Sequence, residues 1–258
     1  MFYSNGAYSL LKVDTPVISG GATPPSFHNI YSYQFDGVDD YIDCGDNDNL
    51  SFGNGVTDSP FSISLWLQIG NTKSRGVISK YGSLGSEWLV YMVGSQVRFL
   101  LVDPGNGSIY ASGNTTLSLN TWYHVGITYD GNGLSGINIY INGIVQTLSS
   151  GGSGTYVSMS NTNQSVEIGK YITREVLGKV DEVAIFNSEL SQGDITAIYG
   201  SSTPTSLSSY SSLVSWWRMG ESANWDGSNW TLTDQGSGGN DATTQNMAES
   251  SRVLDVPT

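Results

Sequence analysis

Residues Thr121 to Thr147 read TWYHVGITYDGNGLSGINIYINGIVQT and carry the pattern of a β-hairpin. Large apolar or aromatic residues alternate with smaller or polar residues in both halves, which is typical of half-buried strands. These residues are Tyr123, Val125, Ile127 and Tyr129 in the first half and Ile137, Ile139 and Ile141 in the second. Asn142-Gly143 then predicts a tight type I′ turn, because both residue types tolerate positive φ.

Segments on both sides of this hairpin resemble parts of the laminin-G-like, concanavalin A-like jelly-roll superfamily. They are YQFDGVDDYIDCG (33–45), FSISLWLQI (61–69) and GKVDEVAIFNSEL (178–190), and with the hairpin they follow the order found in that family. The resemblance covers residues 31–200. It implies an all-β, antiparallel jelly-roll β-sandwich with one short helix.

The composition agrees with this fold class and limits the partners. The chain has 258 residues, 32 glycines and 15 tyrosines, which suits many short strands separated by turns. Its formal net charge is −13 although only 13% of its residues are charged. Such a surface repels phosphate backbones and anionic lipids, so we expect no nucleic acid and no membrane partner.

The single cysteine and the N-terminus bear on the cellular compartment. Cys44 excludes an intramolecular disulfide, and we expect a buried, inert thiol. The first residues, MFYSNGAYSLLKVDTP, lack the basic and apolar regions of a secretory signal. We therefore expect synthesis in the cytoplasm, and release on a virion is one route to the exterior.

The sequence predicts four regions. Residues 1–26 are an extended N-terminal arm, residues 27–200 a laminin-G-like jelly-roll domain, residues 201–212 a Ser/Thr-rich linker, and residues 213–258 a C-terminal extension. Within the domain, Gly151 to Gly154 predicts a flexible loop. Ser188 to Tyr199 predicts a helix, with Ser191 and Asp194 at capping-box spacing.

The C-terminal extension contains LVSWWRMG (213–220) and DQGSGGNDATTQNM (234–247). These resemble the opening strand and acidic turn that in laminin-G-like chains precede FDGVDDY. We expect the extension to complete the sheet of its own domain. The alternatives are a strand supplied to a neighbouring subunit and a truncated second repeat.

No catalytic signature is present. The sequence has no G-x-S-x-G, H-E-x-x-H or phosphate-binding glycine motif, and His28 and His124 are its two imidazoles. The glucanases of the superfamily use an E-x-D-x-x-E strand, which this sequence lacks. We therefore predict that the protein is not an enzyme, with a glycoside hydrolase as the weakest alternative.

The family resemblance implies a structural Ca²⁺ that joins the opening and closing strands. The matching positions are Asp39, Asp181 and the carbonyl of Gly37. The alternative is that Asp36 to Asp40 form an Asx-type turn and that Asp181 accepts hydrogen bonds from nearby amides.

Glycan binding requires aromatic faces that stack on sugars, beside groups that bond their hydroxyls. Trp225, Trp230 and Asn229 lie in the polar stretch SANWDGSNWT and are the predicted ligand-binding residues. The alternative for both tryptophans is to seal a sandwich edge or a subunit contact. Other aromatic residues, Trp66, Trp88 and Trp122, lie on predicted strands and are expected in the core.

Together these features predict a non-catalytic binding or display module. We expect an exposed phage virion protein, a head decoration or fibre, with possible glycan binding. Its partners would be capsid or other virion proteins and copies of itself, as a trimer for example. The alternative is a secreted or cell-surface carbohydrate-binding adhesin, which would be extracellular.

Overall fold

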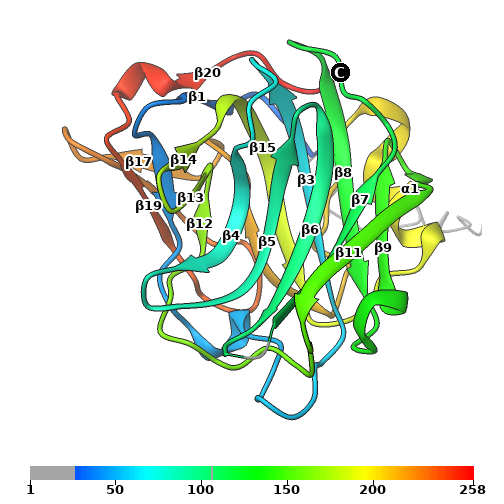
Figure 1. The fold of residues 1–258 in the computed structure, drawn as a ribbon. Coiled ribbons are helices and arrows are strands. Elements are labelled where there is room, and N and C mark those ends of the chain that lie inside the picture. Colours follow the sequence, from blue (N-terminus) through cyan, green and yellow to red (C-terminus); the bar gives the residue numbers. More distant parts are fainter. Residues whose placement is uncertain (1–26, 106) are drawn as a thin grey trace, which may run out of the picture.

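The computed structural model describes residues 27–105 and 107–258 and forms two antiparallel sheets stacked as a sandwich (Figure 1). The predicted arm, residues 1–26, lies outside the described residues. The helix α1 spans Gln192–Tyr199, and short 3₁₀ helices span Asp48–Leu50, Gly133–Gly136, Gly200–Ser202 and Glu249–Ser251. Within the described part, no helix combines the length and apolar character needed to cross a membrane.

The eight-stranded sheet contains the hairpin predicted from the sequence. In spatial order its strands are β10 (Ile144–Val145), β9 (Ile137–Ile141), β8 (Trp122–Tyr129), β3 (Phe61–Ile69), β15 (Leu177–Phe186), β1 (Ser32–Asp36) and β20 (Arg252–Val253), and β16 (Leu213–Trp217) also pairs with β15. The hairpin is confirmed by the β8–β9 pairing, and its second turn has φ of 52° at Asn142 and 75° at Gly143.

The ten-stranded sheet forms the other layer. Its order is β11 (Leu148–Gly154), β7 (Gly107–Gly113), β6 (Gln96–Asp103), β5 (Gly85–Val93), β4 (Gly76–Gly82), β12 (Glu167–Ile168), β2 (Tyr41–Asp43), β19 (Ala242–Gln245), β18 (Trp230–Leu232) and β17 (Ala223–Trp225). A small hairpin, β13 (Lys170–Tyr171) with β14 (Arg174–Glu175), lies against β4.

The glycine-rich stretch 151–154 corrects a prediction, because it belongs to a strand. Strand β11 pairs with β7 over its whole length, from Leu148 opposite Gly113 to Gly154 opposite Gly107. A Cβ atom at Gly152 would collide with the carbonyl oxygen of Ser108. The glycines therefore allow close strand approach, and the prediction of a flexible loop was wrong.

The C-terminal extension pairs with strands of its own chain in both sheets. Strand β16 continues beside β15 where β1 ends, and β19 pairs with β2. Trp217 is fully buried, and its indole Nε1 donates a hydrogen bond to the carbonyl of Asn240 at 2.7 Å. Residues 213–258 thus supply strands and core to the sandwich.

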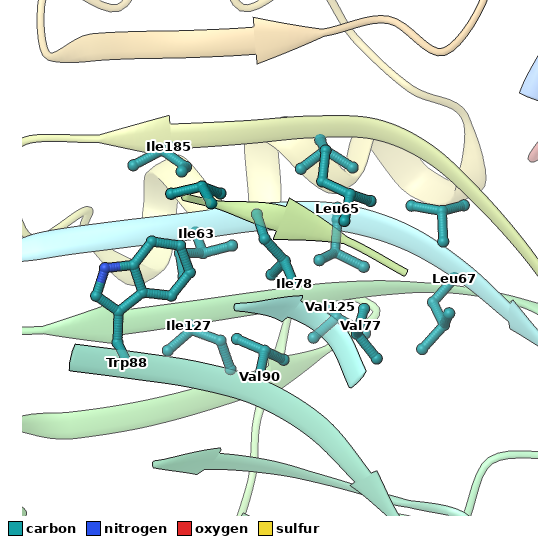
Figure 2. Packing of buried hydrophobic residues seen from close by; sticks show 14 of the residues in the cluster. Ile63, Leu65, Leu67, Val77, Ile78, Trp88, Val90, Val125, Ile127 and Ile185 are labelled. Carbon is teal, nitrogen blue, oxygen red and sulfur yellow. The ribbon is translucent and has the colours of Figure 1, made fainter. Parts of the chain in front are cut away.

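The main core lies between the two sheets (Figure 2). Ile63 and Leu65 of β3 and Val125 of β8 point from the eight-stranded sheet toward Trp88 and Val90 of β5. Cys44 belongs to this core, so the predicted burial of its thiol is confirmed, and burial raises the pKa of that thiol well above its usual range. Strand β3 has the bounds of the predicted segment 61–69.

A second cluster covers the outer face of the eight-stranded sheet. Helix α1 begins at a Ser191–Asp194 capping box, as predicted, and starts later than Ser188. Its Ile195 packs with residues of the linker and of β16, and Trp66 of β3 stacks on Tyr199 at 5.7 Å. One sandwich face is therefore covered, whereas the outer face of β5, β6 and β7 carries partly exposed side chains.

Candidate functional site

Tyrosine and arginine side chains gather on the outer face of the ten-stranded sheet. Strands alternate, so the buried Val90 and Phe99 place Tyr91 and Arg98 on the opposite, outward face. Tyr91 of β5 lies opposite Arg98 of β6, and Arg98 lies opposite Ser112 of β7. Tyr110 of β7 shares this face.

Arg98 is held in a defined position between two rings. Its Cζ lies 4.0 Å from the centroid of the Tyr110 ring and 5.8 Å from that of Tyr91. Its Nε donates a hydrogen bond to Ser112 Oγ at 2.6 Å, and its Nη1 donates to Tyr91 Oη at 3.4 Å. These contacts orient a planar cation between aromatic surfaces.

The β13–β14 hairpin extends this row of rings. Tyr171 lies 5.7 Å from Tyr91 and 5.9 Å from Tyr81, measured between ring centroids. We refer to Tyr81, Tyr91, Arg98, Tyr110 and Tyr171 as the tyrosine face. All five side chains are partly exposed. Beside it lies a hollow of about 200 Å³, lined by Gly82, Ser83, Gln164, Glu167, Lys170 and Ile172.

Of the two tryptophans predicted to bind sugars, the structure buries Trp230 and leaves Trp225 partly exposed. Trp230 is 3% exposed, because β18 turns it into the core, where its ring meets that of Tyr33 at 6.2 Å. Trp225 is partly buried and packs on Trp230 at 5.3 Å. Asn229 lies half-buried in the turn between them. The alternative that both tryptophans seal a sandwich edge describes this arrangement.

The predicted calcium ligands also lie apart. Leu177 pairs with Asp36, and Asp181 follows four residues later on β15, about 13 Å farther along the strand. Asp39 instead clusters with Asp36 and Asp40, whose carboxylate oxygens lie within 4.8 Å of one another.

This Asp36–Asp40 turn matches the alternative considered for it. Asp36 Oδ1 accepts hydrogen bonds from the backbone N–H groups of Val38 and Asp39, and Asp40 Oδ2 accepts one from Asp36. Gly37 has φ of 75°, which suits the turn. Burial raises the pKa of the Asp40 carboxyl to about 6.

Asp181 lies in a separate, buried acidic cluster. Its Oδ2 accepts a hydrogen bond from Asn29 Nδ2 at 2.8 Å, and its Oδ1 accepts one from the backbone N–H of Glu182. Burial and the neighbouring Glu182 carboxylate raise the pKa of Asp181 well above its usual range. Asn29 Oδ1 and Glu221 Oε2 are buried and have no hydrogen-bond partner among the described residues.

Glu182 occupies a strained position beside this cluster. It has φ of 47° at a bulge of β15, where the partner strand changes from β1 to β16. Burial raises the pKa of its carboxyl to about 7, although Arg218, with Nε 3.2 Å away, acts in the opposite direction. The indole Nε1 of Trp216 donates to Glu182 Oε2 at 2.5 Å.

The tyrosine face was not assigned from the sequence, although parts of it are visible there. The segment QVRFLLVD places Arg98 between the apolar residues Val97 and Phe99, which is the signal of an outward-facing cation on a strand. Tyr91 and Tyr110 alternate with core residues in the same way. The register of the strands decides which of these side chains contact one another, and the sequence does not specify the register.

Comparisons with known proteins agree with the architecture. A candidate carbohydrate-binding protein from Bacteroides ovatus superposes with a TM-score of 0.60 at 17% identity, over 90% of this chain and 62% of that one. The chain thus spans about three fifths of that protein. The SAP-like pentraxin of Limulus polyphemus gives a TM-score of 0.42 at 15% identity, covering 64% of this chain and 83% of the pentraxin.

The binding domain of botulinum neurotoxin serotype G gives a TM-score of 0.45 at 18% identity, over 66% of this chain and 46% of the other. A search of curated protein sequences finds no match. A family model described as the concanavalin A-like lectin/glucanases superfamily matches residues 36–196, which is more than half of the chain. The chain therefore belongs to the concanavalin A-like lectin/glucanases superfamily.

Proposed function

We propose that this protein is a non-catalytic carbohydrate-binding module whose ligand lies along the tyrosine face. The proposal rests on the row of partly exposed rings on the outer side of β5 to β7 and on the neighbouring β4 and β13–β14 hairpin. Tyrosine rings stack on the CH faces of sugars, while their hydroxyls and nearby polar groups bond sugar hydroxyls.

The shape of this face suits an extended polymer. Tyr81 and Tyr171 lie at one end and Tyr110 at the other, with Tyr91 and Arg98 between them. Successive sugar units can contact successive rings on such a surface, and the hollow beside Lys170 offers room for a branch or a chain end.

The carboxylates of these strands argue against catalysis at the same place. Retaining glycosidases need two carboxylates about 5 Å apart at the bound sugar. In β4 to β7 and β11 the acidic residues are Glu87 and Asp103, and both are buried. The name of the Bacteroides ovatus protein, which describes carbohydrate binding, gives further support.

A structural Ca²⁺ forms a second part of the proposal. Ca²⁺ prefers carboxylate and amide oxygens, and the buried Asp181 and the partly buried Glu221 and Asn29 supply such atoms. The two unpartnered buried oxygens, on Asn29 and Glu221, favour this cluster over the turn at Asp39. The ion would link the opening segment, β15 and the C-terminal extension.

Display on a virion surface is the biological setting that we propose from the sequence. In that setting the tyrosine face would point outward, and capsid or other virion proteins would contact another surface. Copurification of the chain with purified phage particles tests it, and a gene neighbourhood of polysaccharide-uptake proteins would contradict it.

The binding proposal is tested with a glycan array on the full chain, in the presence of Ca²⁺ and of EDTA. We expect saturable binding to a defined glycan, which Tyr91→Ala weakens about tenfold because a stacking ring is lost. Tyr91→Phe retains the ring and should keep most of the affinity. Binding that survives Tyr91→Ala and disappears in Trp225→Ala would instead locate the site at the β17–β18 hairpin.

A further inference from the structure

Arg98, the cation of the tyrosine face, has no carboxylate partner among the described residues. Arg98 forms no ion pair with a described residue, and its Nη2 donates no hydrogen bond to one. Its contacts are two aromatic rings and the Ser112 hydroxyl, which fix its position and leave its charge uncompensated. An oriented guanidinium of this kind is suited to a carboxylate or another oxyanion.

Two further guanidinium groups lie near Tyr171. Arg174 Cζ is 5.7 Å from the Tyr171 ring centroid. Arg75 lies beside β5, where its carbonyl accepts a hydrogen bond from the backbone N–H of Met92 at 2.8 Å. Burial raises the pKa of Tyr171, whereas the charges of Arg174 and Arg75 act in the opposite direction. Arg75 Nε is buried and has no hydrogen-bond partner in the described part of the chain. Neither arginine forms an ion pair with a described residue.

This arrangement is unusual for so acidic a chain. The sequence has 23 acidic and 10 basic residues, so carboxylates outnumber cations. Elsewhere the cations are mostly compensated, as in Lys80 with Asp46, Lys179 with Asp255 and Arg218 with Glu182. Three arginines without an ion pair to a described residue nevertheless border one row of rings. The carboxylates of β4 to β7, Glu87 and Asp103, are buried, and Glu167 of β12, which lines the neighbouring hollow, is paired with Lys170.

We propose that the tyrosine face recognises an anionic glycan, a polysaccharide carrying carboxylate or sulfate groups. This inference rests on the proposed carbohydrate-binding function and specifies its ligand class. Arg98 is the central contact for the anionic group, and Arg75 and Arg174 attract further groups along the polymer. Tyr91, Tyr110 and Tyr171 stack on the sugar rings, so neither charge nor stacking acts alone.

Because the chain as a whole is acidic, an anionic glycan can be attracted only by the arginines close to it. A net charge of −13 repels an anionic polymer at long range. Screening shortens that repulsion to about 8 Å at physiological ionic strength, so the short-range arginine contacts decide binding there. Added salt should therefore lower the affinity for an anionic glycan less than the removal of Arg98 does.

Biolayer interferometry on the full chain tests the proposal with matched polymers. The anionic probes are polygalacturonate and dextran sulfate, and their neutral counterparts are fully methyl-esterified polygalacturonate and dextran. We expect binding to at least one anionic polymer and at least tenfold weaker binding to its neutral counterpart. Arg98→Gln should reduce the anionic affinity about tenfold or more, because a charge-assisted contact is lost.

Lys179→Gln is the control, because it changes the net charge equally on the other sheet, where Lys179 pairs with Asp255. It should leave the affinity within about twofold, since its distance exceeds the screening length. Equal losses of affinity in Arg98→Gln and Lys179→Gln would mean that only the net charge matters, and would overturn the proposal.

The remaining outcomes separate this inference from the proposed function. Equal binding to neutral and anionic polymers that still needs Tyr91 would overturn anion recognition and retain carbohydrate binding. Binding to none of the polymers would count against both. Self-association that disappears in Arg98→Gln would assign the face to an acidic protein surface and overturn the proposal as well.

Discussion

The ring of Tyr110 extends over Gly151 of the neighbouring strand: a Cβ atom at position 151 would lie 2.6 Å from Tyr110 Oη. The missing side chain therefore leaves room for the ring that carries the Arg98 guanidinium. We expect Gly151→Ala to displace Tyr110 and weaken glycan binding several-fold, with a change in unfolding free energy below about 1 kcal/mol, because the far end of a side chain can move. Titration calorimetry and urea unfolding measure both. Ser153→Ala on the same strand is the control, and equal effects of the two variants would contradict this role.

Trp217 ties the C-terminal extension to the core. It is fully buried, so Trp217→Ala should lower the free energy of unfolding by about 3 to 5 kcal/mol. Trp225→Ala removes a partly exposed ring of the same extension and should cost much less. Urea denaturation of the two variants tests this difference. A small loss in Trp217→Ala would show that the extension contributes little to the stability of the sandwich.

His124 should make the protein sensitive to acid. It is fully buried, burial lowers the pKa of its imidazole to about 3, and Ser64 Oγ lies 2.9 Å from its Nε2. Below pH 6.5 the unfolded chain takes up a proton that the folded chain excludes, so stability is lost as pH falls from 6.5 toward 3. The loss is about 1.4 kcal/mol per pH unit, or about 2 kcal/mol at pH 5.

Unfolding free energies at pH 7 and pH 5 test this contribution. In His124→Gln the drop between the two pH values should be smaller by about 2 kcal/mol, because the titrating group is absent. The carboxylates titrate in both proteins, so they cancel in the difference. An identical drop in both proteins would mean that His124 is protonated in the folded state.

Calcium should stabilise the fold through the Asp181 cluster. At 100 times the dissociation constant, a ligand bound only by the folded state adds about 2.7 kcal/mol and raises Tm. We expect EDTA to reverse this increase and Asp181→Asn to abolish it, whereas Asp39→Asn should retain it. Scanning calorimetry at pH 7.5 measures the shifts. An increase lost in Asp39→Asn and kept in Asp181→Asn would place the ion at the Asp36–Asp40 turn.

The architecture was predictable because its strands obey simple alternation. FSISLWLQI and the central hairpin show period two, and the structure places their apolar residues in one core. Strand β11 was not predicted because four consecutive residues within it, GGSG (151–154), are of types that usually mark loops. Their role in close strand packing depends on β7, which lies far away in the sequence.

The candidate site was less predictable, for two physical reasons. Trp230 lies in a stretch rich in turn-forming residues, and each strand of its hairpin has only three residues, too few to reveal which side faces the core. Tyr91, Tyr110 and Tyr171 come from three separate elements, and only strand register and the β13–β14 hairpin bring their rings together.

Hydroxyl-radical footprinting of the full chain, with and without a glycan that binds it, locates the bound ligand directly. Tyrosine oxidation, quantified by mass spectrometry, reports which rings the ligand covers. We expect slower oxidation of Tyr81, Tyr91, Tyr110 and Tyr171, with unchanged rates at Tyr31 and Tyr210 after correction for radical dose. Protection at Trp225 or Tyr31 with none on the tyrosine face would contradict it.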